Sequence, residues 1–149
     1  MRVVLFLIFA LPGLCYSQTN DNASQPVLNH AALCARNLKT TARFYSNVMQ
    51  LQKIKDPFND TVHVWFKIGE GLALHVIQGN CAVTYPIGTH LCFSVASLEA
   101  FIKHLDILHI PYTNFSKQPK VIQLRPDGVR QIYIQDPDGY WIEINDAKQ

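Results

Sequence analysis

The sequence predicts an α+β fold in which two βαβββ modules form a cupped, partly barrel-like sheet. The prediction rests on two internal repeats and on the order of the strand and helix patterns between them. In the first repeat, residues 28–38 (LNHAALCARNL) align with residues 88–98 (GTHLCFSVASL), and His30 falls on His90. Both copies lead directly into a helical pattern. Because such repeats reflect a repeated structural unit, we expect the chain to use one small unit twice.

The second repeat closes each unit. Residues 69–77 (GEGLALHVI) align with residues 136–144 (DPDGYWIEI), which places His75 on Glu143. Each copy therefore has one metal-capable side chain near its start and another near its end.

A single domain accounts for the mature chain. The 149 residues, of which 48% are hydrophobic and 16% charged, suit one globular core. We assign the domain to residues 27–146, with module 1 at about 27–78 and module 2 at about 88–146. The net charge of +2 includes no basic block, so nucleic acid is not an expected partner.

The first 17 residues have the layout of a secretory signal peptide. Arg2 precedes an apolar run at residues 3–11, a Pro-Gly breaker follows, and small residues lie just before Gln18. An uncleaved anchor is the alternative, but nine apolar residues are too few for the roughly 20 that a bilayer needs. We therefore expect residues 1–17 to be cleaved and the protein to be exported (periplasmic or secreted), without stable membrane insertion. Residues 18–26 are expected to be a disordered lead-in.

Cleavage leaves three cysteines, Cys34, Cys81 and Cys92. An odd number leaves at least one thiol unpaired or paired between chains. Cys34 and Cys92 lie on the two repeated strands and are expected to be buried free thiols. The absence of a CxxC spacing argues against a cysteine metal site.

Module 1 is predicted to run strand, helix and three strands. Asn37 is a suitable N-cap, and Leu38, Ala42 and Tyr45 fall on one helical face. Asp56-Pro57 ends a weak strand pattern, and a Gly-Glu-Gly turn joins the last two strands. The expected elements are a strand at 28–35, a helix at 38–51, a weak strand at 53–58, and strands at 62–68 and 72–78.

Module 2 is predicted to repeat this order. Ser97 is a suitable cap for an apolar-striped helix, and Asp136-Pro137-Asp138-Gly139 has strong turn chemistry between two strands. The expected elements are a strand at 89–95, a helix reaching Leu108, a strand near 111–115, a long polar loop at 117–128, and a hairpin of strands at 130–135 and 140–144.

The repeated positions suggest a metal site. Strands alternate their faces, so His30, His75, His90 and Glu143 can each face the cleft that the helices leave uncovered. A twofold duplication would bring these equivalent side chains together. Nitrogen and oxygen ligands of this kind suit Zn²⁺, Ni²⁺, Fe²⁺ or Mn²⁺, and two histidines with one carboxylate also form the facial triad of non-haem iron sites. A carboxylate in the apolar strand YWIEI is costly to bury unless it is paired or bound to a cation.

Other polar side chains are expected to have ordinary roles. The histidines outside the repeats are expected to be hydrogen-bonded, structural residues: His63, His104 and His109. Three arginines could orient an anionic substrate, although solvated surface is the expected position of each: Arg43, Arg125 and Arg130.

These motifs resemble the vicinal oxygen chelate superfamily, which includes glyoxalase I, extradiol dioxygenases, fosfomycin-resistance transferases and bleomycin-resistance proteins. The resemblance covers about residues 27–146 and is carried by LNHAAL, TTARFYSNVMQL, GTHLCFSV and YIQDPDGYWIEI. It implies paired βαβββ modules around a metal, and homodimers are common in such families.

The resemblance also implies the site. The metal positions fall on His30, His75, His90 and Glu143, and their presence argues against the metal-free bleomycin-binding branch. Glyoxalase I typically has a glutamate where this chain has His75. Fosfomycin transferases have a threonine where this chain has Ala32. The resemblance therefore does not extend to strict glyoxalase I or fosfomycin-transferase activity.

The expected function is that of an exported, metal-dependent, glyoxalase-like enzyme of the lyase or isomerase type. Its partner would be a small substrate that chelates the divalent metal through neighbouring oxygens, with Glu143 as the catalytic base. The alternatives are an Fe-dependent extradiol-type dioxygenase that uses His30, His90 and Glu143, and a non-catalytic module that binds a small molecule or metal. A homodimer is expected.

Overall fold

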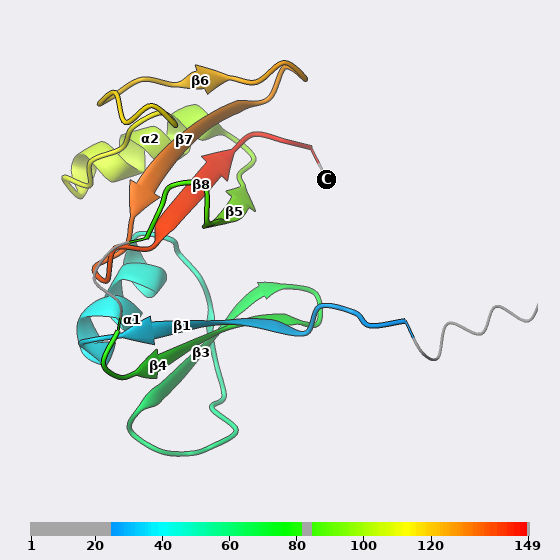
Figure 1. Cartoon of the computed structure of the whole chain (residues 1–149), viewed down its shortest axis with the longest axis vertical. Coiled ribbons are helices and arrows are strands. Elements are labelled where there is room, and N and C mark those ends of the chain that lie inside the picture. Colours follow the sequence, from blue (N-terminus) through cyan, green and yellow to red (C-terminus); the bar gives the residue numbers. More distant parts are fainter. Residues whose placement is uncertain (1–24, 82–84, 149) are drawn as a thin grey trace, which may run out of the picture.

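The computed structural model describes residues 25–81 and 85–148, and within them the predicted βαβββ duplication is confirmed (Figure 1). The expected signal peptide and all but the end of the lead-in lie outside the described residues. Module 1 comprises β1 (His30–Ala35), α1 (Leu38–Asn47), β2 (Lys53–Ile54), β3 (His63–Gly69) and β4 (Leu72–Gln78). Module 2 comprises β5 (His90–Ser94), α2 (Leu98–Ile107), β6 (Gln123–Leu124), β7 (Arg130–Gln135) and β8 (Trp141–Asn145).

Each module forms its own four-stranded mixed sheet. The strand orders are β1-β4-β3-β2 and β5-β8-β7-β6, with the first strand parallel to the last in each case. The two sheets occupy separate halves of the molecule in Figure 1 and are cupped rather than closed into one barrel. As a result, β1 and β5, which carry the repeated histidines, are both edge strands of their sheets.

The helices bury one face of each sheet. Tyr45 of α1 and Phe66, Leu74 and Val76 of the sheet are almost fully buried in the core. In module 2, Leu98 and Leu105 of α2 and four isoleucines of β7 and β8 are likewise almost fully buried. Each such side chain contributes about 1.5–3 kcal/mol on burial. None of the helices in the described part of the chain covers the opposite face of either sheet, and the repeated polar residues lie there.

The helix starts follow the prediction, whereas one helix end does not. The Asn37 and Ser97 side chains accept hydrogen bonds from the N–H groups of Thr40 and Ala100. Helix α1 ends at Asn47, earlier than the predicted 51. The chain turns away there, and Gln50 has a left-handed φ of 55° that no helix can accommodate.

The short strands differ from the prediction. The weak strand expected at 53–58 is reduced to β2, because Asp56-Pro57 stops it and Pro lacks a ladder donor. The strand expected near 111–115 is not formed: Thr113 makes only isolated bridges, to Pro119 and Tyr133. Strand β6 forms instead within the expected loop at 117–128, since Gln123 and Leu124 pair with β7.

The β7–β8 turn joins the two modules. Asp136 Oδ2 accepts a hydrogen bond from Tyr45 Oη at 3.0 Å. The nearly buried Asp138 accepts hydrogen bonds from Thr41 Oγ1 at 2.5 Å and from the Arg36 backbone N–H at 2.8 Å. We call this set the Asp136–Asp138 joint. It fixes the β7–β8 turn of module 2 against β1 and α1 of module 1.

A disulfide corrects the prediction for the cysteines. Cys34, expected to be a buried free thiol, is bonded to Cys81, which ties the end of β1 to the connector between the modules. Their Cα atoms are 5.5 Å apart, within the normal range. Cys92 is free, as expected, but it is exposed rather than buried. Among the described residues, no helix has the length and apolar character needed to cross a membrane.

Candidate metal centre

Module 2 supplies a histidine–carboxylate pair. His90 opens β5 and Glu143 lies in the middle of β8, and the parallel register places both on the uncovered face. His90 Nε2 is 3.2 Å from Glu143 Oε2. His90 Nδ1 donates to the Ile87 carbonyl at 2.7 Å, which orients the ring with Nε2 towards Glu143.

Glu143 is held as an ionised carboxylate. It is only 5% exposed, and both of its oxygens accept hydrogen bonds. Tyr133 Oη donates to Oε2 at 2.6 Å, and Asn145 Nδ2 donates to Oε1 at 2.9 Å. Burial by itself raises the pKa of Glu143, but the hydrogen bonds from Tyr133, Asn145 and Cys92 and the charge of His90 together hold that pKa below its usual value. An ionised carboxylate can bind a cation or accept a proton.

Sequence reasoning missed Tyr133. This tyrosine lies directly opposite Glu143 in the β7–β8 ladder and is 2% exposed. Its pKa is raised, first by burial and then by the hydrogen bond to Glu143, so the phenol stays protonated and donates. The predicted turn at 136–139 fixes the register of the hairpin. That register could have identified Tyr133 as the residue opposite Glu143.

Cys92 also contacts the carboxylate. Its thiol donates to Glu143 Oε1 at 3.3 Å. Desolvation and this hydrogen bond raise the pKa of Cys92 to about 12. The thiol is therefore protonated at neutral pH and is a poor metal ligand or nucleophile.

Module 1 supplies two imidazoles. His30 opens β1, His75 lies opposite Ala32 on neighbouring β4, and the two ring centres are 6.1 Å apart. His75 is 6% exposed and stacks on Trp65 with ring centres 3.9 Å apart. Burial lowers the pKa of His75, and so do the neighbouring His63 and His30. Its neutral ring has a buried Nε2 without a hydrogen-bond partner in the part of the chain described.

The four predicted site residues form two pairs in one chain. His30 and His75 belong to one sheet, and His90 and Glu143 belong to the other. Within residues 25–81 and 85–148, the four do not come together as one group of ligand atoms within 4.8 Å.

A different set does meet that spacing: Asp56, Asp60 and His63, on the loop before β3 and at its start. The two carboxylates accept hydrogen bonds from backbone N–H groups of the loop, and Asp60 Oδ2 is hydrogen-bonded to His63 Nδ1 at 2.7 Å. The hydrogen-bonded role expected for His63 is therefore confirmed.

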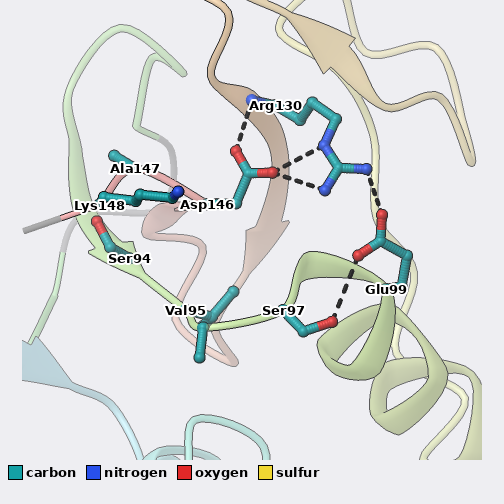
Figure 2. Close-up of a pocket in the computed structure, with 9 residues that line it drawn as sticks. Ser94, Val95, Ser97, Glu99, Arg130, Asp146, Ala147 and Lys148 are labelled. Carbon is teal, nitrogen blue, oxygen red and sulfur yellow. Dashed lines mark hydrogen bonds and ion pairs between the residues drawn. The ribbon is translucent and has the colours of Figure 1, made fainter.

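The pocket in Figure 2 lies elsewhere on module 2, where β5, α2 and the C-terminal end of β8 meet. It has a volume of about 640 Å³. Arg130 crosses it and is bonded to Asp146 on one side and to Glu99 on the other. Because both acids compensate its charge, Arg130 has a structural role. The site predicted from sequence is not in this pocket.

The fold and the two residue pairs define a class of protein with paired, cupped βαβββ modules. The family model described as Glyoxalase/Bleomycin resistance protein/Dioxygenase superfamily matches residues 27–144, and the chain belongs to this superfamily. The resemblance noted in the sequence is thereby confirmed.

Individual relatives are distant. The chain is 26% identical over 138 residues to Glyoxylase I 4 of Arabidopsis thaliana, which covers 83% of this chain and 75% of that protein. A putative glyoxalase family protein from Bacillus anthracis superposes with a TM-score of 0.66 at 23% identity, covering 83% of this chain and 96% of the other. A lactoylglutathione lyase from Agrobacterium tumefaciens superposes with a TM-score of 0.60 at 21% identity, covering 83% and 94%. These structural likenesses show the fold.

Proposed function

We propose that the protein is an exported, metal-dependent enzyme of the glyoxalase-like lyase or isomerase type, acting on a small substrate with two neighbouring oxygens. The observation that carries the proposal is the His90–Glu143 pair, in which a buried carboxylate lies 3.2 Å from an imidazole nitrogen. A buried charge of this kind is costly unless a partner compensates it. A divalent cation would do so, and it would act as a Lewis acid towards the substrate oxygens.

The donor set fits such a cation. His30, His75, His90 and Glu143 would hold Zn²⁺, Ni²⁺, Fe²⁺ or Mn²⁺, which accept imidazole and carboxylate ligands. The buried Nε2 of His75, which has no hydrogen-bond partner among residues 25–81 and 85–148, and the lowered pKa of its ring support this, because a metal binds the neutral imidazole.

Two copies of the chain would complete each site. Within the described residues, β1 and β5 each pair with one strand only, so a second copy could adjoin them, while the Asp136–Asp138 joint keeps the two sheets of one chain in separate halves. In a twofold homodimer, His30 and His75 of one copy would meet His90 and Glu143 of the other. Such an interface is self-complementary and makes two equal sites.

Glu143 would be the catalytic base. Its ionised carboxylate can accept a proton from a carbon next to the chelating oxygens. Tyr133 Oη donates a hydrogen bond of 2.6 Å to Glu143 Oε2 and so limits rotation of the Glu143 carboxylate. Because His75 occupies the position of a glutamate typical of glyoxalase I, we do not extend the proposal to lactoylglutathione lyase activity.

A second candidate is an Fe-dependent extradiol-type dioxygenase. The specific observation in its favour is the stacking of His75 on Trp65 at 3.9 Å, with Phe58 also parallel to the His75 ring. If those contacts hold His75 away from the ion, His30, His90 and Glu143 remain as two histidines and one carboxylate, the set used by non-haem iron.

Export is supported by the disulfide. Cys34 and Cys81 are bonded across 47 residues of sequence, and such bonds persist mainly in oxidising compartments. This agrees with the layout of residues 1–17.

Metal analysis of the purified protein tests the proposal. We expect about one divalent ion per chain in the native protein and loss of that ion in His90→Ala. His109→Asn is the matched control, because His109 is exposed and asparagine tolerates its left-handed φ of 55°. Redox-inert Zn²⁺ or Ni²⁺ favours the lyase or isomerase, and oxygen-sensitive Fe²⁺ favours the dioxygenase. A native protein that takes up no metal on reconstitution contradicts both.

A further inference from the structure

We infer that Arg125 sets the substrate class of the proposed site by binding an anionic group beside the metal-chelating oxygens. The class is that of 2-oxo and 2-hydroxy acids, in which a carboxylate adjoins a carbonyl or hydroxyl oxygen. The inference rests on the proposed function and deepens it.

The backbone presents Arg125 rigidly. Residues 125–128 form the tight turn between β6 and β7, in which the Gly128 N–H donates to the Arg125 carbonyl at 3.0 Å and the Arg125 N–H donates to the Val129 carbonyl at 2.8 Å. Gly128 has a φ of 85°, a conformation that glycine adopts without steric cost. The adjacent pairing of Leu124 with Arg130 continues the ladder, so the turn is fixed to the sheet.

The side chain is directed at the candidate site. Arg125 Nη2 donates to Asp127 Oδ2 at 2.6 Å, which fixes one side of the guanidinium. On the other side, Nη1 is 3.7 Å from Glu143 Oε1. This distance is too long for a hydrogen bond, and Oε1 already accepts hydrogen bonds from Asn145 and Cys92.

A bound cation would leave the Nη1 side of Arg125 available, while Asp127 stays paired with Nη2. In the protein alone, the Glu143 carboxylate compensates part of the charge on Arg125. If a metal bound to Glu143 neutralised its negative charge, Nη1 of Arg125 would face the site without a compensating charge from Glu143. Arg125 stays protonated at any physiological pH, and its planar fork suits a carboxylate. Its side chain is 38% exposed, so a small ligand can reach it.

The other two candidate arginines do not share this geometry. Arg130 is bonded on both sides by Glu99 and Asp146 (Figure 2). Arg43 lies on α1 and lines a separate hollow with Lys39 and Lys53. Of the three, Arg125 is the one whose guanidinium lies within 4 Å of Glu143.

Oxalate is a suitable probe, because it offers two neighbouring oxygens for chelation and two carboxylates. We would measure its binding to the metal-loaded, full-length mature protein by calorimetry and measure metal affinity separately for every variant. Arg125→Ala is expected to weaken oxalate binding by about tenfold to a hundredfold, the range of a charge-assisted hydrogen bond, with metal affinity changed by less than about threefold. Arg125→Lys keeps the charge but lacks the planar guanidinium. Its affinity for oxalate should lie between those of Arg125→Ala and the native protein. Arg43→Ala, the matched control, should bind oxalate as the native protein does.

The outcomes separate this inference from the proposed function. If oxalate binds Arg125→Ala as tightly as the native protein, or if native protein binds metal but no oxalate, the substrate class is wrong and the metal site stands. If Arg125→Ala binds neither metal nor oxalate, Arg125 stabilises the metal site and does not bind the anionic group of the substrate. If the native protein binds no metal, the proposed function fails and this inference fails with it.

Discussion

Glu143 is the residue from which the candidate site is best understood. It is a nearly buried carboxylate in a strand whose neighbours are apolar, and Tyr133, Asn145, Cys92 and His90 all contact it. Hydrogen bonds to the charged form offset the cost of burial and keep the carboxylate ionised. The same contacts fix its orientation, which a metal ligand or a base requires.

Tyr133→Phe removes the shortest of these contacts. We expect the pKa of Glu143 to rise and the free energy of unfolding to fall by about 1.5–3 kcal/mol, the contribution of a hydrogen bond to a charged group. Urea unfolding at neutral pH measures the loss. Tyr112→Phe is the control, because Tyr112 is also a buried tyrosine of module 2 and, among the described residues, Glu143 accepts no hydrogen bond from it. Equal stability of Tyr133→Phe and the native protein would show that the contact does not stabilise the carboxylate.

At the level of elements, the β7–β8 turn has two functions. It closes the hairpin that pairs Tyr133 with Glu143, and it carries the Asp136–Asp138 joint to module 1. Turn chemistry alone explains the first function. The second explains why two acidic side chains are almost fully buried in a turn.

Asp138→Ala tests the joint. It leaves the Thr41 hydroxyl and the Arg36 N–H without their acceptor, so we expect the free energy of unfolding to fall by about 2–3 kcal/mol. Asp106→Ala removes an exposed carboxylate 3.6 Å from Lys120 and should change stability by less than about 0.5 kcal/mol. Similar urea midpoints for the two variants would rule out a stabilising role for the joint.

The start of β7 is tied to the end of β8 by a pH-sensitive contact. Asp146 accepts hydrogen bonds from the Arg130 backbone N–H and then from its guanidinium, and these lower the pKa of Asp146 below 3.8. A lowered carboxylate pKa stabilises the folded state above the unfolded pKa, and that stabilisation is lost as the pH falls through the folded pKa. The native protein should therefore be more stable than Asp146→Asn above about pH 5, and the difference should shrink as the pH falls below the usual carboxylate pKa. A difference in urea midpoint that stays constant across this range would contradict the assignment.

At the level of the whole molecule, one chain holds the four predicted site residues as two separate pairs. The Asp136–Asp138 joint and the Cys34–Cys81 disulfide both fix the connection between the modules. We propose that this connection, together with the edge positions of β1 and β5, favours pairing with a second copy over rearrangement within the chain.

Loss of the disulfide should destabilise the molecule substantially. Closing a loop with a sequence separation of 47 contributes about 3–4 kcal/mol in the chain-entropy account. The double variant Cys34→Ser, Cys81→Ser should therefore unfold at a lower urea concentration, and dithiothreitol should shift the native protein in the same direction. Cys92→Ser should retain the sensitivity to dithiothreitol. A native protein whose mass after alkylation reports three free thiols would contradict the bond.

The fold could be predicted from the sequence because its signals are local and repeated. The paired phrases around His30 and His90 identified β1 and β5, and Asn37 and Ser97 located both helix starts. Features that depend on the path of the connector could not be predicted in this way. The Cys34–Cys81 bond and the burial of Asp138 arise only once the modules are docked, and strand β6 forms because β7 offers a free ladder edge to a polar loop.

Metal recovery in mixed dimers tests whether each metal site combines residues from two copies of the chain. His30→Ala and His90→Ala should each bind no metal alone. When the two variants are unfolded together and refolded, about half of the dimers should be mixed, and each mixed dimer should contain one intact site. We expect recovery of about a quarter of the native metal content per chain, because the intact histidines come from different copies. No recovery from a sample shown to contain mixed dimers would contradict it.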